Sequence, residues 1–142
     1  MSFNAEYLLQ GEKKVFNSEF CEVKYLEREN VVLLTWKKFC SLEDYREPVR
    51  YGLDLIKNHK GSNFVCDARN GFEDIEEDVK WDFEYFIPEF SKEGCRQVVF
   101  ILDAVNSIEG EIDMFTNEFK KYFTVDKVTS LEEALQKIIK FD

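Results

Sequence analysis

Three short, nearly uninterrupted runs of apolar residues place the strongest limit on how this chain can fold. They are residues 31–36, 63–66 and 98–102, and a stretch with helical spacing follows each of them. A strand without polar alternation is typically buried on both faces, and parallel strands are joined by helical crossovers. The alternation therefore predicts an α/β fold with a mixed, mostly parallel sheet and helices on its faces.

Two further strands flank these three. Residues 20–26 alternate polar and apolar side chains, and a polar turn at 27–30 joins them to 31–36, so the two segments should form an antiparallel hairpin. Residues 125–128 fit a short edge strand. We therefore expect four to five strands in one domain over 20–142, with 1–19 as an N-terminal arm or an edge strand around Val15 and Phe16.

Four amphipathic stretches predict helices. The first opens on Ser41-Leu42-Glu43-Asp44, which resembles a capping box, and it stops at Gly61. Pro48 lies several residues inside, so either this helix is kinked or a short turn precedes the main helix. The other helices are expected over 73–92, over 108–123 and from 131 onward. The second has a core stripe that consists of Ile75, Val79, Phe83, Phe86, Ile87 and Phe90.

Charge and composition exclude several classes of function. The formal net charge of −10 disfavours nucleic acid and anionic membrane surfaces as partners. His59 is the only histidine, which argues against a histidine-rich metal site and a Ser-His or Cys-His triad. The four cysteines form no C-x-x-C pair, and no apolar run approaches membrane-spanning length. We expect a cytoplasmic protein with reduced thiols, no metal, no cofactor and no stable membrane insertion.

Polar residues follow the second apolar run directly, as Asp67-Ala68-Arg69-Asn70. Sites in open α/β sheets gather beyond the carboxyl ends of the strands. Arg69 could clamp a carboxylate or phosphate while Asp67 orients it, or the two could pair with each other while Asn70 serves the turn. The structural interpretation is favoured. The turn contains no Ser, Thr or His that could act as nucleophile or base, so we expect no enzyme.

An acidic run, Glu73-Asp74-Ile75-Glu76-Glu77-Asp78, opens the second predicted helix. Its spacing matches no calcium-binding loop, and acids are favoured near a helix N-terminus by the helix dipole. We therefore expect a solvated helix start.

Aromatic residues also lie off the predicted core stripes. Trp81 and Tyr85 lie on the far side of the second helix, and Tyr51 and Leu55 lie off the core face of the first. Such stripes indicate either helix–helix contact within the domain or an exposed binding patch. Proline in both helices would allow one of them to shift.

Four motifs occur in order along residues 20–142: Tyr45-Arg46-Glu47-Pro48 opening a helix, Val65-Cys66-Asp67-Ala68-Arg69-Asn70 ending a strand, a helix with Pro88, and the terminal Ser130-Leu131-Glu132-Glu133-Ala134-Leu135. This pattern resembles the bacterial SpoIIAA-like STAS proteins, distant relatives of the anti-sigma-factor antagonists. The resemblance implies a mixed sheet of four to five strands and a role in protein interaction or ligand sensing without catalysis.

The same resemblance bears on regulation. Regulatory members carry a phosphorylated Ser or Thr in the turn that corresponds to Asp67-Ala68-Arg69-Asn70, but here Ala68 and Arg69 stand where the hydroxyls would be. Regulation by phosphorylation at this turn is therefore not expected. The fold is also similar to that of Sec14-like lipid-binding domains, which makes an apolar ligand an alternative.

The leading functional prediction is a non-enzymatic interaction or regulatory module that binds a protein partner, possibly a second copy of itself, through its first two helices. The candidate binding residues are Asp67, Arg69, Asn70, Trp81, Tyr85, Tyr51 and Leu55. The alternative is a carrier or sensor of a small apolar molecule held between the sheet and a movable helix. An enzyme that uses Asp67 with Arg69 is the least favoured interpretation.

Overall fold

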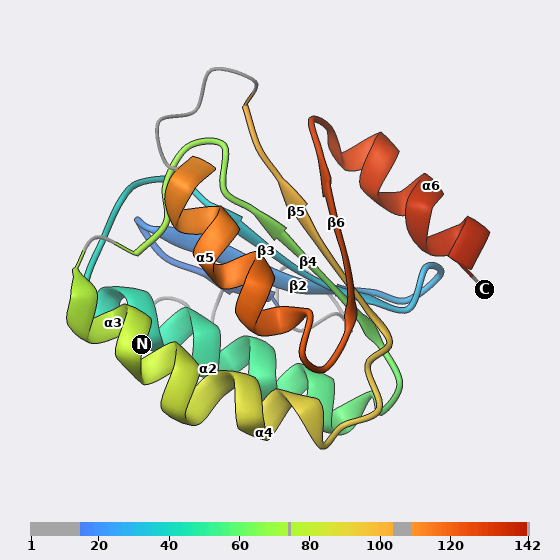
Figure 1. Cartoon of the computed structure of the whole chain (residues 1–142), viewed down its shortest axis with the longest axis horizontal. Coiled ribbons are helices and arrows are strands. Elements are labelled where there is room, and N and C mark those ends of the chain that lie inside the picture. The colour runs from blue at the N-terminus through green and yellow to red at the C-terminus, as the bar shows by residue number, and fades with distance from the viewer. Residues whose placement is uncertain (1–14, 74, 104–108, 142) are drawn as a thin grey trace.

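The computed structural model describes residues 15–73, 75–103 and 109–141, which form an α/β structure around one mixed sheet (Figure 1). The six strands lie side by side in chain order. They are β1 (Val15–Asn17), β2 (Cys21–Leu26), β3 (Val31–Trp36), β4 (Asn63–Asp67), β5 (Gln97–Ile101) and β6 (Thr124–Val128). The pairs β1–β2 and β2–β3 are antiparallel, and the pairs from β3 to β6 are parallel.

The predicted α/β class is confirmed, but two details of the sheet were wrong. It has six strands rather than four to five, and it is mixed rather than mostly parallel. The difference arises because Val15 and Phe16 are buried and pair with β2, which adds a second antiparallel pair to the predicted β2–β3 hairpin. A three-residue strand is too short to show a period in the sequence.

Helices cover both faces of this sheet (Figure 1). One face carries α2 (Glu43–Asn58), the helical stretch α3 (Glu76–Trp81), η1 (Asp82–Phe86) and α4 (Ile87–Ser91), and α5 (Glu109–Phe119); the other carries α6 (Leu131–Phe141). Alternate residues of the central strands enter two separate cores: Leu34 and Cys66 face α2, whereas Leu33 and Val65 face α6. The apolar runs have no polar alternation because both of their faces are covered.

The first helix begins where it was predicted, but its N-terminus is held differently. Pro48 lies inside one continuous helix, and Leu42 occupies the N-cap position without any side-chain capping bond. The capping box is therefore not formed. Leu42 has φ 54° and ψ −128°, a conformation that is rare for a residue with a side chain.

The second predicted helix is one continuous stretch whose middle departs from α geometry. Residues Asp82–Phe86 form a π-helix, in which the Ile87 N–H donates to the carbonyl of Asp82 five residues earlier. Such π turns occur frequently at functional sites. None of the helices in the described ranges is long and apolar enough to cross a membrane.

Candidate functional site

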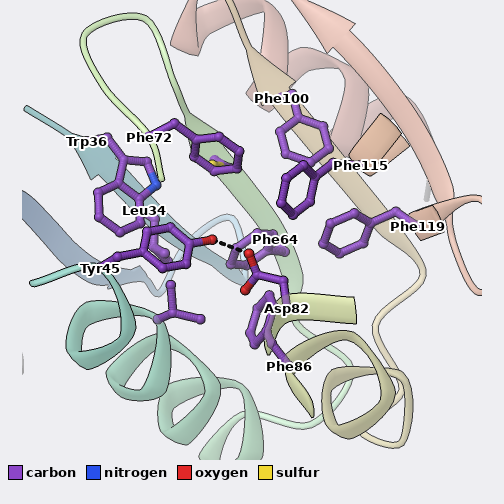
Figure 2. Close-up of a pocket in the computed structure, with 12 residues that line it drawn as sticks. Leu34, Trp36, Tyr45, Phe64, Phe72, Asp82, Phe86, Phe100, Phe115 and Phe119 are labelled. Atoms are coloured by element: carbon purple, nitrogen blue, oxygen red, sulfur yellow. Dashed lines mark hydrogen bonds between the residues drawn. The ribbon is translucent and has the colours of Figure 1, made fainter. Parts of the chain in front are cut away.

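A small cavity lies inside the larger core, between the sheet and the helices α2, η1 and α5 (Figure 2). Its volume is about 20 Å³, which is room for one or two water-sized groups. Strands β3, β4 and β5 form its floor, and the loop after β4 closes one side. The lining consists of Leu34, Trp36, Tyr45, Val49, Phe64, Cys66, Phe72, Asp82, Phe86, Phe100, Phe115 and Phe119.

Aromatic rings make most of this lining and pack against one another. Phe72 contacts Phe115 with ring centroids 5.1 Å apart, and the Trp36 ring stacks on Tyr45 at 5.0 Å. Edge-to-face and offset contacts of this kind are favourable beyond the area that they bury. Phe72 comes from the loop after β4, where no periodic pattern marked it as a core residue.

Asp82 is the one acidic residue among the described lining residues, and it is 1% exposed. Its Oδ2 accepts a short hydrogen bond from the Tyr45 hydroxyl, whereas its Oδ1 is buried without a partner in the described part of the chain. Figure 2 shows the carboxyl group directed from η1 into the space among the rings. A buried polar atom without a partner costs about 1–3 kcal/mol, so this oxygen requires an explanation.

The surroundings of Asp82 favour its neutral form. Burial raises the pKa of Asp82 well above its ordinary value of 3.8, and the nearby carboxylate of Asp78 raises it further. The Tyr45 hydrogen bond and the more distant Arg46 lower the pKa, but burial is the largest cause. Burial and the neighbouring Asp82 likewise raise the pKa of Tyr45 well above 10. Burial therefore favours the protonated form of both side chains.

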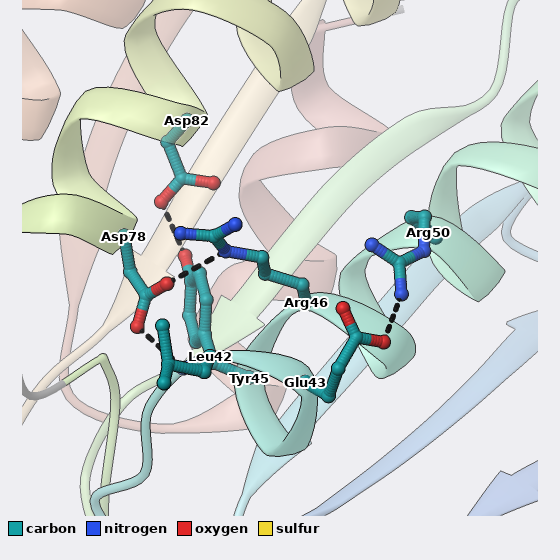
Figure 3. Close-up of polar contacts among 7 residues, drawn as sticks. All are labelled: Leu42, Glu43, Tyr45, Arg46, Arg50, Asp78 and Asp82. Carbon is teal, nitrogen blue, oxygen red and sulfur yellow. Dashed lines mark hydrogen bonds and ion pairs between the residues drawn. The ribbon is translucent and has the colours of Figure 1, made fainter.

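A second buried carboxylate, Asp78, joins α3 to the start of α2 (Figure 3). The Arg46 Nε–H donates to Asp78 Oδ1 at 2.8 Å, and the Leu42 N–H donates to Asp78 Oδ2 at 2.8 Å. The Arg46 guanidinium also lies 5.5 Å from the centre of the Trp81 ring. Asp78 thus holds the N-terminus of α2 in place, the role that was predicted for a capping box.

The burial of these acids contradicts the prediction of a solvated helix start. Glu76 and Glu77 are exposed as expected, but Glu73 is 2% exposed and Asp78 is fully buried. The whole run was predicted to be exposed because acids at a helix start are usually solvated. The spacing held a usable signal, since Asp78 and Asp82 are four residues apart and both fall beside the apolar stripe of this helix.

The Asp67 turn forms a local ion pair. The Arg69 Nε and Nη2 groups donate to the two Asp67 oxygens at 2.9 and 2.6 Å, and the Arg69 N–H donates to Asp67 Oδ1 at 3.2 Å. The hydrogen bonds to Asp67 raise the pKa of Arg69. Asn70 is exposed. Because Asp67 is occupied by its own neighbour, this geometry favours the structural interpretation of the turn over a clamp for a ligand.

The four aromatic and apolar candidates do not form one exposed patch. Leu55 is buried, and Tyr51 is half-buried with its ring 5.5 Å from that of Phe16 in β1. Trp81 is half-buried against Tyr45 and Tyr85, and Tyr85 is 39% exposed. Tyr85 is therefore the one exposed residue among these four candidates, and the stripe on α2 packs within the domain.

Other reactive groups in the described ranges are inaccessible or dispersed. All four cysteines are free and buried. Burial raises the pKa of Cys21 and Cys66, and it raises the pKa of Cys95 to about 12. Within those same ranges, no group of three or more His, Cys, Asp or Glu residues is placed to hold a metal ion.

Comparison with known proteins identifies no relative: no family model, curated protein or solved structure matches this chain.

Proposed function

We propose that this chain is a non-enzymatic, STAS-like regulatory module that senses a small apolar ligand in the cavity between the sheet and the helices. The observation that carries the proposal is the aromatic cavity around one unpartnered, buried carboxyl oxygen of Asp82. Binding pockets are commonly apolar with a small number of placed polar groups. The proposal includes a cytoplasmic location, which the four free thiols support.

The helix that carries Asp82 supplies a means of response. Asp82 begins the π segment, and Pro88 is the second residue of α4, which follows that segment. A ligand larger than the present cavity has to displace this helix, and a displaced helix changes the outer surface that carries Trp81 and Tyr85. The resemblance of the motifs to STAS proteins, which regulate through partners, is consistent with such a response.

Filling the cavity tests the proposal. Val49 is 2% exposed and lines the cavity, so Val49→Ile adds one methyl group there. Val65 is fully buried on the opposite face of the sheet, so Val65→Ile is the matched control. Native mass spectrometry of the gently purified chain and thermal shifts with a panel of small apolar compounds measure binding. We expect Val49→Ile to reduce the ligand-induced shift and Val65→Ile to keep it.

The proposal is abandoned if the purified chain carries no bound mass and no compound in the panel raises the melting temperature. It is equally contradicted if both valine variants respond to ligand as the unmodified chain does.

A partner protein or a second copy bound at Trp81 and Tyr85 is the second candidate function. The specific observation is that these rings contact each other at 5.3 Å while Tyr85 remains 39% exposed. Light scattering and pull-down experiments with Tyr85→Lys test this candidate. A chain that is monomeric at all concentrations, with no partner lost on substitution, contradicts it.

A further inference from the structure

The apolar lining of the cavity leaves the chemical class of its ligand open, and Asp82 narrows that class. Oδ2 of Asp82 is already engaged by Tyr45, so Oδ1 is the atom available to a bound molecule. Arg46 acts on Asp82 from a distance, but its guanidinium is paired with Asp78. An ionised Asp82 would be a buried charge without a cation in direct contact, which is disfavoured.

A bound molecule therefore meets the Asp82 carboxyl group, the indole N–H of Trp36 and, elsewhere, mostly ring carbon. A hydroxyl group suits this environment because it can accept a hydrogen bond from a neutral carboxyl and donate one to an ionised carboxyl. Rings suit the remaining surface, since Phe72, Phe100 and Phe115 offer their edges and faces to the same space (Figure 2).

Water is the competing occupant. A buried water typically makes about three hydrogen bonds to polar groups. Asp82 and Tyr45 already satisfy each other in part, the buried Trp36 Nε1–H is one further polar group without a partner in the described part of the chain, and most of the other lining residues offer only carbon. A molecule with one hydroxyl and an otherwise apolar surface matches this mostly apolar lining.

We propose that the cavity binds a small aromatic alcohol, a phenol-sized molecule whose hydroxyl group hydrogen-bonds to Oδ1 of Asp82 while its ring packs among the phenylalanines. This inference rests on the proposed function and specifies its ligand. The cavity of about 20 Å³ admits the hydroxyl end, and η1 is the element that moves to admit the ring.

Phenol and toluene are the probes, because they differ only in a hydroxyl in place of a methyl group. Calorimetric titration of the full chain should give an affinity about tenfold higher for phenol, the equivalent of one net hydrogen bond. Asp82→Leu should bring the two affinities together while toluene still binds, and Asp82→Asn should keep most of the preference. Asp54→Leu, an exposed acid on α2, is the control and should change neither affinity.

A second variant makes binding measurable even if the unmodified chain binds the probes weakly. Phe115→Leu enlarges the cavity from α5, so it should strengthen the binding of both probes while the preference for phenol remains. Circular dichroism checks that each variant is folded.

The outcomes separate the two proposals. Equal affinities for phenol and toluene mean that water satisfies Oδ1, which overturns the aromatic-alcohol assignment but leaves an apolar ligand. A preference for phenol that survives Asp82→Leu overturns the role of Asp82. Failure of both probes to bind the unmodified chain and Phe115→Leu overturns this inference, whereas the proposed function falls only if native mass spectrometry and the whole panel of apolar compounds also show no binding.

Discussion

The Asp78 carboxylate ties the strained start of α2 to α3, and its removal should be among the costliest single substitutions in this protein. Asp78→Ala deletes the acceptor of two hydrogen bonds, one from the Leu42 N–H and one from the Arg46 side chain. The substitution also leaves Leu42 at φ 54° without the contact that holds it there. Figure 3 shows that both bonds converge on this one side chain.

The expected magnitude follows from these contacts. Each hydrogen bond to an ionised group contributes about 1.5–3 kcal/mol, so two give about 3–6 kcal/mol. The Arg46 side chain is 23% exposed, so water partly solvates its guanidinium after the loss. We therefore expect the lower part of that range, about 3 kcal/mol. Asp78→Asn keeps one acceptor oxygen and should cost about half as much.

Urea unfolding measures this prediction, with Glu43→Ala as the control. The Glu43–Arg50 ion pair lies on the same helix, but its side chains are 73% and 41% exposed, so its loss should cost less than about 1 kcal/mol. A double-mutant cycle with Arg46→Ala should give a coupling energy of about 1–3 kcal/mol. The reasoning is refuted if Asp78→Ala costs no more than Glu43→Ala, or if the cycle gives no coupling.

Three further predictions concern Leu42, Asp82 and the thiols. Leu42 is 48% exposed and has a positive φ, so Leu42→Gly should stabilise the protein by about 0.5–1 kcal/mol in urea unfolding, and a loss of stability would contradict this. Because burial raises the pKa of Asp82 above 3.8, the native state retains a proton that the unfolded state releases as pH rises. The free energy of unfolding, measured relative to Asp82→Asn, should therefore fall above about pH 4 by at most about 1.4 kcal/mol per pH unit, and a difference that is flat between pH 4 and 7 would argue against a buried acid. The four buried thiols should react with a colorimetric thiol reagent at pH 8 only slowly in the native protein and completely in urea, and fast labelling of the native chain would be inconsistent with their burial.

The patterns of apolar residues over short stretches of the sequence were sufficient to predict most of the fold. The apolar runs and helical stripes predicted the order of the elements from β2 to α6, and the predicted antiparallel β2–β3 hairpin is formed, with Val23 opposite Leu34. Short elements were harder to recognise in the sequence. The strand β1 is three residues long. The π segment is five residues long, and the residue pattern of the sequence did not distinguish it from the α-helix on either side.

The candidate site depended on contacts between distant segments. By itself the sequence determined where strands and helices form, because the burial of an apolar face is set by residues two to four positions apart. It also marked Asp67 and Arg69, whose ion pair is local. Only the tertiary structure decided that Asp78 and Asp82 are buried, because their partners Arg46 and Tyr45 lie 32 and 37 residues away in the chain. A carboxyl group enters a core only where such a partner meets it, so its burial follows from how the helices pack.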